Sequence, residues 1–214
     1  LRMRDFASAE LALPDNGSYR KYADLERAFA VWNVFAAAEF SVAPKQWCFA
    51  FAGCVAYRGY FSEAHAEQFG QALRRQDLDV FVIGIPAYST LGWFDDPVLN
   101  TVIRYPDAEL ARLIFHELAH QVVYISGDTV FNESFAVAVE LEGVDRWLAR
   151  DGDPAKRTAF ALAQQRQGAF IDLVMKYRDS LSALYASAAS AEEKRRRKAE
   201  TFAAMKAEYP TLKA

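Results

Sequence analysis

The chain has 214 residues, of which 52% are hydrophobic and 25% are charged, and its formal net charge is −3. This composition is typical of a globular protein with one sizeable core, and the small net charge gives no strong attraction to nucleic acid or to an anionic membrane. Charged residues and glycines interrupt the apolar runs well short of a membrane span, and Leu1 is not followed by a signal-peptide pattern, so any targeting segment should be absent or already removed.

The first half of the chain is expected to be rich in short strands. Turn-forming Pro, Asp, Asn and Gly mark the first loop, Ser62 is placed to cap a helix, and β-branched and aromatic residues mark the last strand. The expected elements are, in order, a loop at residues 13–19, a helix at 22–40, two short strands within 46–61, a helix at 62–75 and a strand leading into an extended edge segment at 78–94.

The second half is expected to be helical from residue 107 onward. Gly127 is placed to end the first helix, Pro154 suits a first helical turn, and Ser190 with Glu193 forms a capping box. The expected helices cover residues 107–126, 132–150, 154–187 and the segment after Ser190. The pattern predicts one α+β domain over residues 1–214, with a β-rich part at about 1–105 and a helical part at about 106–214.

Two cysteines, Cys48 and Cys54, are separated by six positions around Gly53. This spacing could place them across a tight hairpin as a disulfide formed in an oxidising compartment. They could equally be two small buried hydrophobic residues, and the spacing leaves both interpretations open. A zinc site made from these two residues alone is not expected, because the usual spacing and further ligands are missing.

The most informative motif is HELAH, which contains His116, Glu117 and His120. Residues four apart on a helix are offset by about 40° around the axis and about 6 Å along it, so both imidazoles can reach one ion. Zinc suits two neutral imidazoles in a tetrahedral site with an open position. Glu117 can then reach a metal-bound water without binding the metal, take its proton and deliver it to a leaving amine.

The alternative is that the motif arose by chance on a core helix. The flanking residues are apolar, and burying Glu117 among them without a partner would be costly. A metal supplies that partner, so the motif favours a zinc site. His65, the third histidine of the chain, lies in a polar segment and is expected to be an exposed bystander.

A catalytic zinc needs a third protein ligand. Glu133 is the choice, because a short loop could fold the first turn of the next helix back onto the HELAH helix. Glu140 lies about 10 Å further along nearly the same helix face, so it is a substrate-anchoring residue, a second-shell partner or a surface residue. Asp128 could cap the second helix or orient a ligand histidine. Glu142 is a further carboxylate in this region.

These motifs resemble two groups of metallopeptidases. HELAH followed by NESFAVAVE (residues 132–140) is similar to the gluzincins, especially the large zinc aminopeptidases, whose third ligand lies in such a segment. The blocks LPDNGSY, WCF, GCVAYRGYF, AYSTLGWFDDPVLNT, FHELAHQ and FNESFA resemble a family of bacterial predicted aminopeptidases. The likeness extends from about Leu13 to Leu148 and implies a zincin-like (gluzincin) fold and one zinc held by His116, His120 and Glu133.

The resemblance also implies where a peptide substrate would bind. In zincins, an edge strand ahead of the metal helix holds the peptide by backbone hydrogen bonds. Residues 88–94 are in the corresponding place, so Tyr88, Leu91 and Gly92 are expected to contact the substrate. The alternative is a strand end and turn with Trp93 and Phe94 in the core.

Two further groups are needed for an aminopeptidase. A carboxylate must recognise the substrate's ammonium group, and the candidates are Asp95, Asp96 and Glu140. A donor must stabilise the tetrahedral intermediate opposite the zinc. No histidine follows His120, so this donor is sought downstream, and the choice among Tyr177, Arg178 and Tyr185 is Tyr185.

The family resemblance often goes with export and a lipid anchor ahead of this chain, which would place the protein in the bacterial cell envelope and favour the Cys48–Cys54 disulfide. The partner is then a peptide, not nucleic acid, and the anchoring segment is absent from this chain. Three functions remain in competition: a zinc aminopeptidase, a restricted zinc endopeptidase, and an envelope binding module with a structural zinc. Only three convincing ligands are present and Glu117 is intact, which favours an enzyme.

Overall fold

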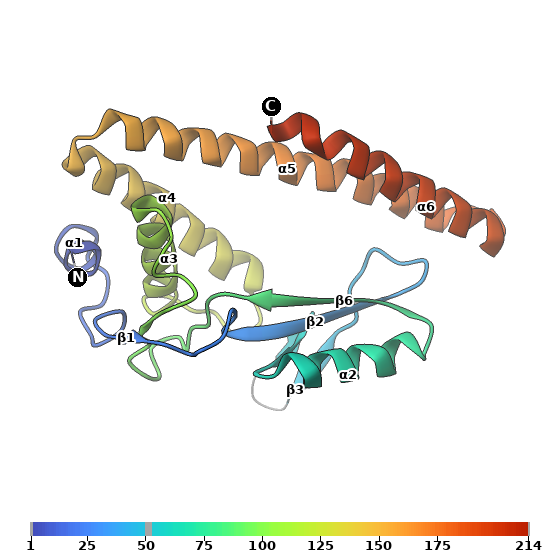
Figure 1. Cartoon of the computed structure of the whole chain (residues 1–214), viewed down its shortest axis with the longest axis horizontal. Helices are drawn as coiled ribbons and strands as arrows, with labels where there is room; N and C mark the ends of the chain where they lie inside the picture. Colours follow the sequence, from blue (N-terminus) through green and yellow to red (C-terminus); the bar gives the residue numbers. More distant parts are fainter. Residues whose placement is uncertain (1, 50–52, 214) are drawn as a thin grey trace.

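Residues 2–49 and 53–213 are described by a computed structural model of the chain (Figure 1). The helices are α1 (Arg2–Leu11), α2 (Glu63–Arg74), α3 (Asp107–His120), α4 (Thr129–Asp151), α5 (Pro154–Ala186), α6 (Ala191–Glu208) and the short η1 (Tyr209–Lys213). The strands are β1 (Tyr22–Ala23), β2 (Val31–Ala38), β3 (Trp47–Phe49), β4 (Gly53–Val55), β5 (Arg58–Tyr60), β6 (Leu78–Ile85) and β7 (Val98–Leu99).

The main sheet has the strand order β5-β2-β6, and both pairs are antiparallel. Helix α2 covers one face of this sheet, and the α5–α6 hairpin passes over the other side in the view of Figure 1. The buried side chains between α2 and the sheet are Trp32, Val34, Ala36, Ala66 and Leu73. Strand β6 lies at one edge of this sheet but ends at Ile85, so it covers only the first part of the predicted strand and edge segment at 78–94.

The predicted helix at residues 22–40 is wrong, because Val31–Ala38 forms the central strand β2. Its three successive alanines at 36–38 favour a helix locally, but Val31 and Trp32 are good strand formers. Pairing with strands on both sides and burial of most of its length decide the outcome. Because β2 is buried along most of its length, its sequence is almost entirely apolar and lacks the alternation of polar and apolar residues that identifies a strand.

The helical half agrees with the prediction except that α3 ends early and α4 begins at Thr129, three residues before its predicted start. Ser62 caps α2, Pro154 begins α5, and Ser190 caps α6. Helix α3, however, ends at His120 instead of continuing to residue 126. Gly127 adopts φ +84° in the turn that precedes α4, so it shapes the connection and not the end of α3.

The core below the metal motif is built by helices α1, α3 and α4. Helix α1 was not expected from the sequence, yet Phe6 packs on both Phe115 and Trp147. The fully buried face of α3 includes Phe115 and Leu118. This face fixes the orientation of α3, so that the opposite face carries the polar residues of the motif. None of the helices in the described ranges has the length and apolar character needed to cross a membrane.

Cys48 and Cys54 lie opposite each other in the β3–β4 hairpin and form a disulfide in the structure. The sequence interpretation as a hairpin disulfide agrees with this arrangement. Residues 50–52 at the tip of the hairpin lie outside the described residues.

Candidate metal centre

Helix α3 presents His116 and His120 one turn apart near its C-terminal end. The two rings are nearly perpendicular, with centroids 4.8 Å apart, and their Nε2 atoms are separated by 3.1 Å. The His120 side chain is 6% exposed and that of His116 is 19% exposed. Both rings therefore bring one nitrogen toward a common point, which is covered on the side of α3 and open on the side of Glu133, whose side chain is 56% exposed.

Glu133 completes the cluster from the first turns of α4. Its Oε2 lies 3.5 Å from His116 Nε2, and its Oε1 lies 3.7 Å from His120 Nε2. One ligand atom from each of the three residues lies within 4.8 Å of the other two. Two imidazole nitrogens and one carboxylate oxygen with an exposed side are the donor set that fits a catalytic zinc.

A short loop between α3 and α4 makes this approach possible. The side chain of Asn132 accepts a hydrogen bond from Ile125 N at 2.8 Å and donates one to Ile125 O at 2.8 Å. Asp128 caps α4 by accepting from Phe131 N at 2.9 Å. Of its two predicted roles, Asp128 therefore has the capping role. Asn132, which the sequence analysis placed in the NESFAVAVE segment without a role, is 2% exposed and fixes the loop directly before Glu133.

Glu140 lies behind the cluster and not on its open side. Its Oε2 is 2.8 Å from His116 Nδ1, and its Oε1 is 3.4 Å from Arg112 Nη1. The Glu140 side chain is only 8% exposed. Its assignment to substrate binding is therefore corrected, because the carboxylate is buried and already engaged in orienting His116. Glu142 is exposed and pairs with Arg146, away from the cluster.

Removal of the Glu140 carboxylate should weaken metal binding without removing a ligand. A partner that orients a ligand histidine typically contributes about 10- to 100-fold to metal affinity. We expect Glu140→Ala to lose about that much, and Glu140→Gln to lose less because the amide oxygen still accepts from His116 Nδ1–H. Competition with a chromophoric chelator measures both dissociation constants, and parental affinity in Glu140→Ala would contradict this role.

The two histidines differ in their electrostatic surroundings. Burial lowers the pKa of His120, and the nearby His116 lowers it further. Burial also opposes protonation of His116, but its hydrogen bond to Glu140 and the charges of Glu117, Glu140 and Glu133 raise its pKa overall. His120 is thus held as a neutral imidazole, which is the form that binds a metal. The acidic cluster around His116 supplies negative charge that a cation would neutralise.

Glu117 points to the side of the helix occupied by the segment after β6. Burial raises the pKa of its carboxyl group, while His116 and a hydrogen bond with Ser89 lower it. Ser89 also hydrogen-bonds the buried Tyr19, whose own pKa is raised by burial and by the charge of Glu117. Ser89 and Tyr19 were missed by the sequence analysis, since neither belongs to a recognised metal motif.

The predicted substrate segment lies beside α3 but is not an extended strand. It forms a turn fixed by the buried Asp96, which accepts from Thr90 N at 2.8 Å and from Thr90 Oγ1 at 3.0 Å. Tyr88 is 55% exposed and Leu91 is 36% exposed. Gly92 has φ +83° and packs on Gln121, the residue after His120.

The alternative that the next two aromatic residues belong to the core is wrong. Trp93 is 84% exposed and Phe94 is 74% exposed. The turn instead presents both side chains to solvent. The segment therefore stays available as a binding surface next to the metal helix.

The predicted catalytic role of Tyr185 is wrong. Its ring packs on Phe40, and Lys198 lies over it, at the far end of the α5–α6 hairpin. Because α5 is one uninterrupted helix, Tyr185 lies about 27 Å along it from Gln167, the α5 residue that contacts Arg112 beside Glu140. Tyr177 is also engaged elsewhere, by a 2.7 Å hydrogen bond to Glu208.

The other residues considered in the sequence analysis lie outside the metal cluster or are engaged in other contacts. His65 is exposed on α2 and takes no part in the cluster. Arg178 pairs with the adjacent Asp179. Among the three proposed ammonium anchors, Asp96 and Glu140 are buried and engaged, and only Asp95 is exposed.

His116, His120 and Glu133 have the composition of a site for one metal ion, and Glu117 is a further carboxylate next to His116 on the same helix. The chain belongs to the protein family described as "Putative aminopeptidase", which matches residues 1–214. This match confirms the family resemblance seen in the sequence blocks and indicates a peptidase. No curated protein and no solved structure matches the chain.

Proposed function

We propose that the protein is a zinc-dependent aminopeptidase with a zincin-like fold of the gluzincin type. The observation that supports this proposal most is the convergence of His116, His120 and Glu133, with Glu117 beside them. Family membership supports the peptidase class independently. A structural zinc site is normally closed by four protein ligands, whereas this cluster offers three and an exposed side. That difference favours an enzyme over a binding module.

The chemistry follows from the donors and from Glu117. When bound, zinc would polarise the scissile carbonyl and acidify a coordinated water. Glu117, whose carboxyl group interacts electrostatically with His116 and Glu133, would accept the proton of the attacking water and return it to the leaving amine. Burial keeps the pKa of this carboxyl above its ordinary value, which suits a group that must both take and release a proton.

A tyrosine near Glu133 is a better candidate than Tyr185 for stabilising the tetrahedral intermediate. Burial raises the pKa of Tyr57, and the nearby Tyr88 and Glu133 raise it further. The Tyr57 ring packs on Phe35 and is 42% exposed, so its hydroxyl group stays protonated and accessible within the electrostatic influence of Glu133. We propose that Tyr57 supplies this hydrogen bond, while Tyr88, Leu91 and Gly92 bind the substrate backbone.

One observation keeps an endopeptidase in consideration. Two of the three carboxylates suggested as ammonium anchors, Asp96 and Glu140, are buried and occupied by Thr90 and His116. If Asp95 does not meet the substrate amine, the site has no ammonium anchor among the three carboxylates considered. The enzyme would then accept a peptide chain that continues beyond the scissile bond on the N-terminal side.

A matched pair of substrates tests the proposed function. The zinc-loaded protein is incubated with an aminoacyl chromogenic amide and with the same compound acetylated at its amine. We expect cleavage of the free amine only, since acetylation removes the ammonium charge. Preference for the acetylated compound would replace the aminopeptidase by the endopeptidase. Absence of cleavage across a broad peptide library, with zinc bound, would favour the binding module.

A further inference from the structure

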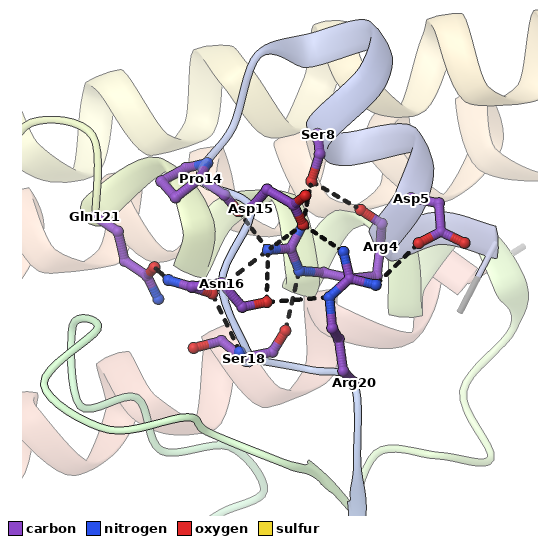
Figure 2. A network of polar contacts seen from close by, with 9 residues as sticks. All are labelled: Arg4, Asp5, Ser8, Pro14, Asp15, Asn16, Ser18, Arg20 and Gln121. Atoms are coloured by element: carbon purple, nitrogen blue, oxygen red, sulfur yellow. Dashed lines mark hydrogen bonds and ion pairs between the residues drawn. The ribbon is translucent and has the colours of Figure 1, made fainter.

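The side chain of Arg4 is completely buried between α1 and the loop at residues 13–19 (Figure 2). Its Nε donates to Ser18 O at 2.9 Å, and its Nη2 donates to Asn16 O at 3.2 Å and also to Pro14 O. Its Nη1 donates to Ser8 Oγ. A guanidinium group presents several donors in a fixed plane, so it can hold several backbone carbonyls of one loop in place at once.

The loop held by Arg4 has a demanding conformation. Asn16 Oδ1 accepts from Ser18 N at 3.1 Å, and Tyr19 has a positive φ of 60°. A Cβ atom on Gly17 would lie 2.2 Å from the Asp95 carboxylate, so any larger residue here would require the exposed Asp95 side chain to move. Hydrogen bonds from Arg4 and within the loop therefore fix its conformation, and this fixed conformation determines where the Asn16 side chain lies.

One side-chain hydrogen bond connects this loop to the residue that follows the last residue of the metal helix. Asn16 Nδ2 donates to Gln121 Oε1 at 2.7 Å, as Figure 2 shows. Gln121 is the C-cap residue of α3 and directly follows His120. On its other side, Gln121 packs on the backbone of Gly92. The end of α3 is therefore held between the N-terminal loop and the substrate segment.

The two histidines depend differently on this contact. The ring of His116 is oriented by Glu140, which binds its Nδ1. His120 Nδ1 is buried and has no hydrogen-bond partner among the described residues. His120 also occupies the last position of α3, where a helix most readily frays. Its position thus depends on how firmly the helix end is held.

We propose that the segment from Arg4 to Ser18 is a positioning element of the metal centre, which acts through the Asn16–Gln121 hydrogen bond to hold His120 in its ligand position. Arg4, Asn16 and Gln121 are positioning residues and touch neither metal nor substrate. This inference rests on the proposed metal centre. The experiment below gives different results if the positioning role fails and if the metal centre itself fails.

The deciding variant is Gln121→Met, because methionine keeps the length of the side chain and removes the acceptor for Asn16. Arg4 variants are less useful because loss of a fully buried guanidinium endangers the fold. A net hydrogen-bond contribution corresponds to about a threefold to tenfold change in an equilibrium constant. We expect zinc to bind about threefold to tenfold more weakly to Gln121→Met, measured by competition with a chromophoric chelator.

Asn16→Asp is the conservative variant that should retain tight binding. It keeps the acceptor for Ser18 N and Arg4. The Gln121 amide can rotate and donate its Nε2–H, which is buried without a partner among the described residues, to the new carboxylate. Asn16→Ala has no acceptor for Ser18 N and no partner for Gln121, so its zinc affinity should be lowered as in Gln121→Met. Gln76→Met is the matched control, since Gln76 also lies at a helix end but is exposed and remote from α3.

Two further measurements distinguish positioning from a merely structural role. The visible spectrum of the cobalt-substituted protein reports ligand geometry and should change in Gln121→Met but not in Gln76→Met. The midpoint of thermal unfolding of the metal-free proteins reports stability. If Gln121→Met lowers the unfolding midpoint and yet keeps the parental zinc affinity and cobalt spectrum, that result would overturn the positioning role of the loop and leave the proposed metal centre in place. Failure of the parent protein to bind zinc or cobalt would overturn the metal centre together with the positioning role.

Discussion

Glu117→Gln is expected to lower the rate of peptide cleavage by about 100- to 10,000-fold, the range typical of a positioned general base. The amide is nearly isosteric with the carboxylate, so packing on the buried side of α3 should be preserved. It cannot accept a proton at neutral pH, so the attacking water loses its base and the leaving amine loses its acid. The comparison uses the same aminoacyl amide for both proteins, both fully loaded with zinc.

The control for this substitution is Glu142→Gln, which removes a charge from an exposed α4 position that pairs only with Arg146 in the described contacts. Its cleavage rate should stay close to that of the parent. Zinc affinity should change little in either variant, since neither residue is a ligand. A Glu117→Gln protein that retains the parental rate would remove Glu117 from the mechanism.

Glu133→Ala is expected to weaken zinc binding by more than about 100-fold, because loss of a direct ligand should exceed the loss of a residue that only orients a ligand. Only His116 and His120 would then remain from the cluster. The loop and the start of α4 should keep their structure, since Asn132 and Asp128 hold them. Chelator competition on parent and variant measures the effect.

The comparison with Glu140→Ala makes this prediction specific. If Glu133 is the third ligand, Glu133→Ala loses more affinity than Glu140→Ala. The reverse order would mean that Glu140 binds the metal and Glu133 does not. Unchanged circular dichroism in both variants ensures that affinities are compared between folded proteins.

The metal motif could be predicted from the sequence because its geometry is local. Helical spacing alone places His116 and His120 on one face, and the apolar residues around them indicate which face is buried. Glu133 was within reach because the connection to the next helix is short. The role of Glu140 was left open, since helical spacing shows that it lies near the same face but not which histidine nitrogen it meets.

The remaining features depend on contacts between distant segments. Strand β2 was mistaken for a helix because its alanines favour a helix locally, whereas its pairing with β5 and β6 is a tertiary effect. The early end of α3 at His120 depends on Asn132 and Asp128, which close the following loop. Arg4 lies more than a hundred positions from the metal motif, and no pattern in the sequence links it to Gln121.

Tyr185 illustrates a different kind of error. It was chosen by its place downstream of the motif, and a long straight helix carries it away from the cluster. Tyr57 and Tyr19, which precede the motif in the chain, interact electrostatically with Glu133 and Glu117. Order along the chain is therefore a poor guide to which side chains lie near the cluster.

All the proposed roles depend on one zinc ion bound between α3 and α4. Diffraction data collected on either side of the zinc absorption edge, from crystals grown with zinc, test this binding most directly. We expect one anomalous peak per chain, about 2.0–2.2 Å from the Nε2 atoms of His116 and His120 and from a carboxylate oxygen of Glu133, with Glu117 not coordinated. A peak elsewhere, or no peak at this cluster, would contradict zinc binding by these three residues.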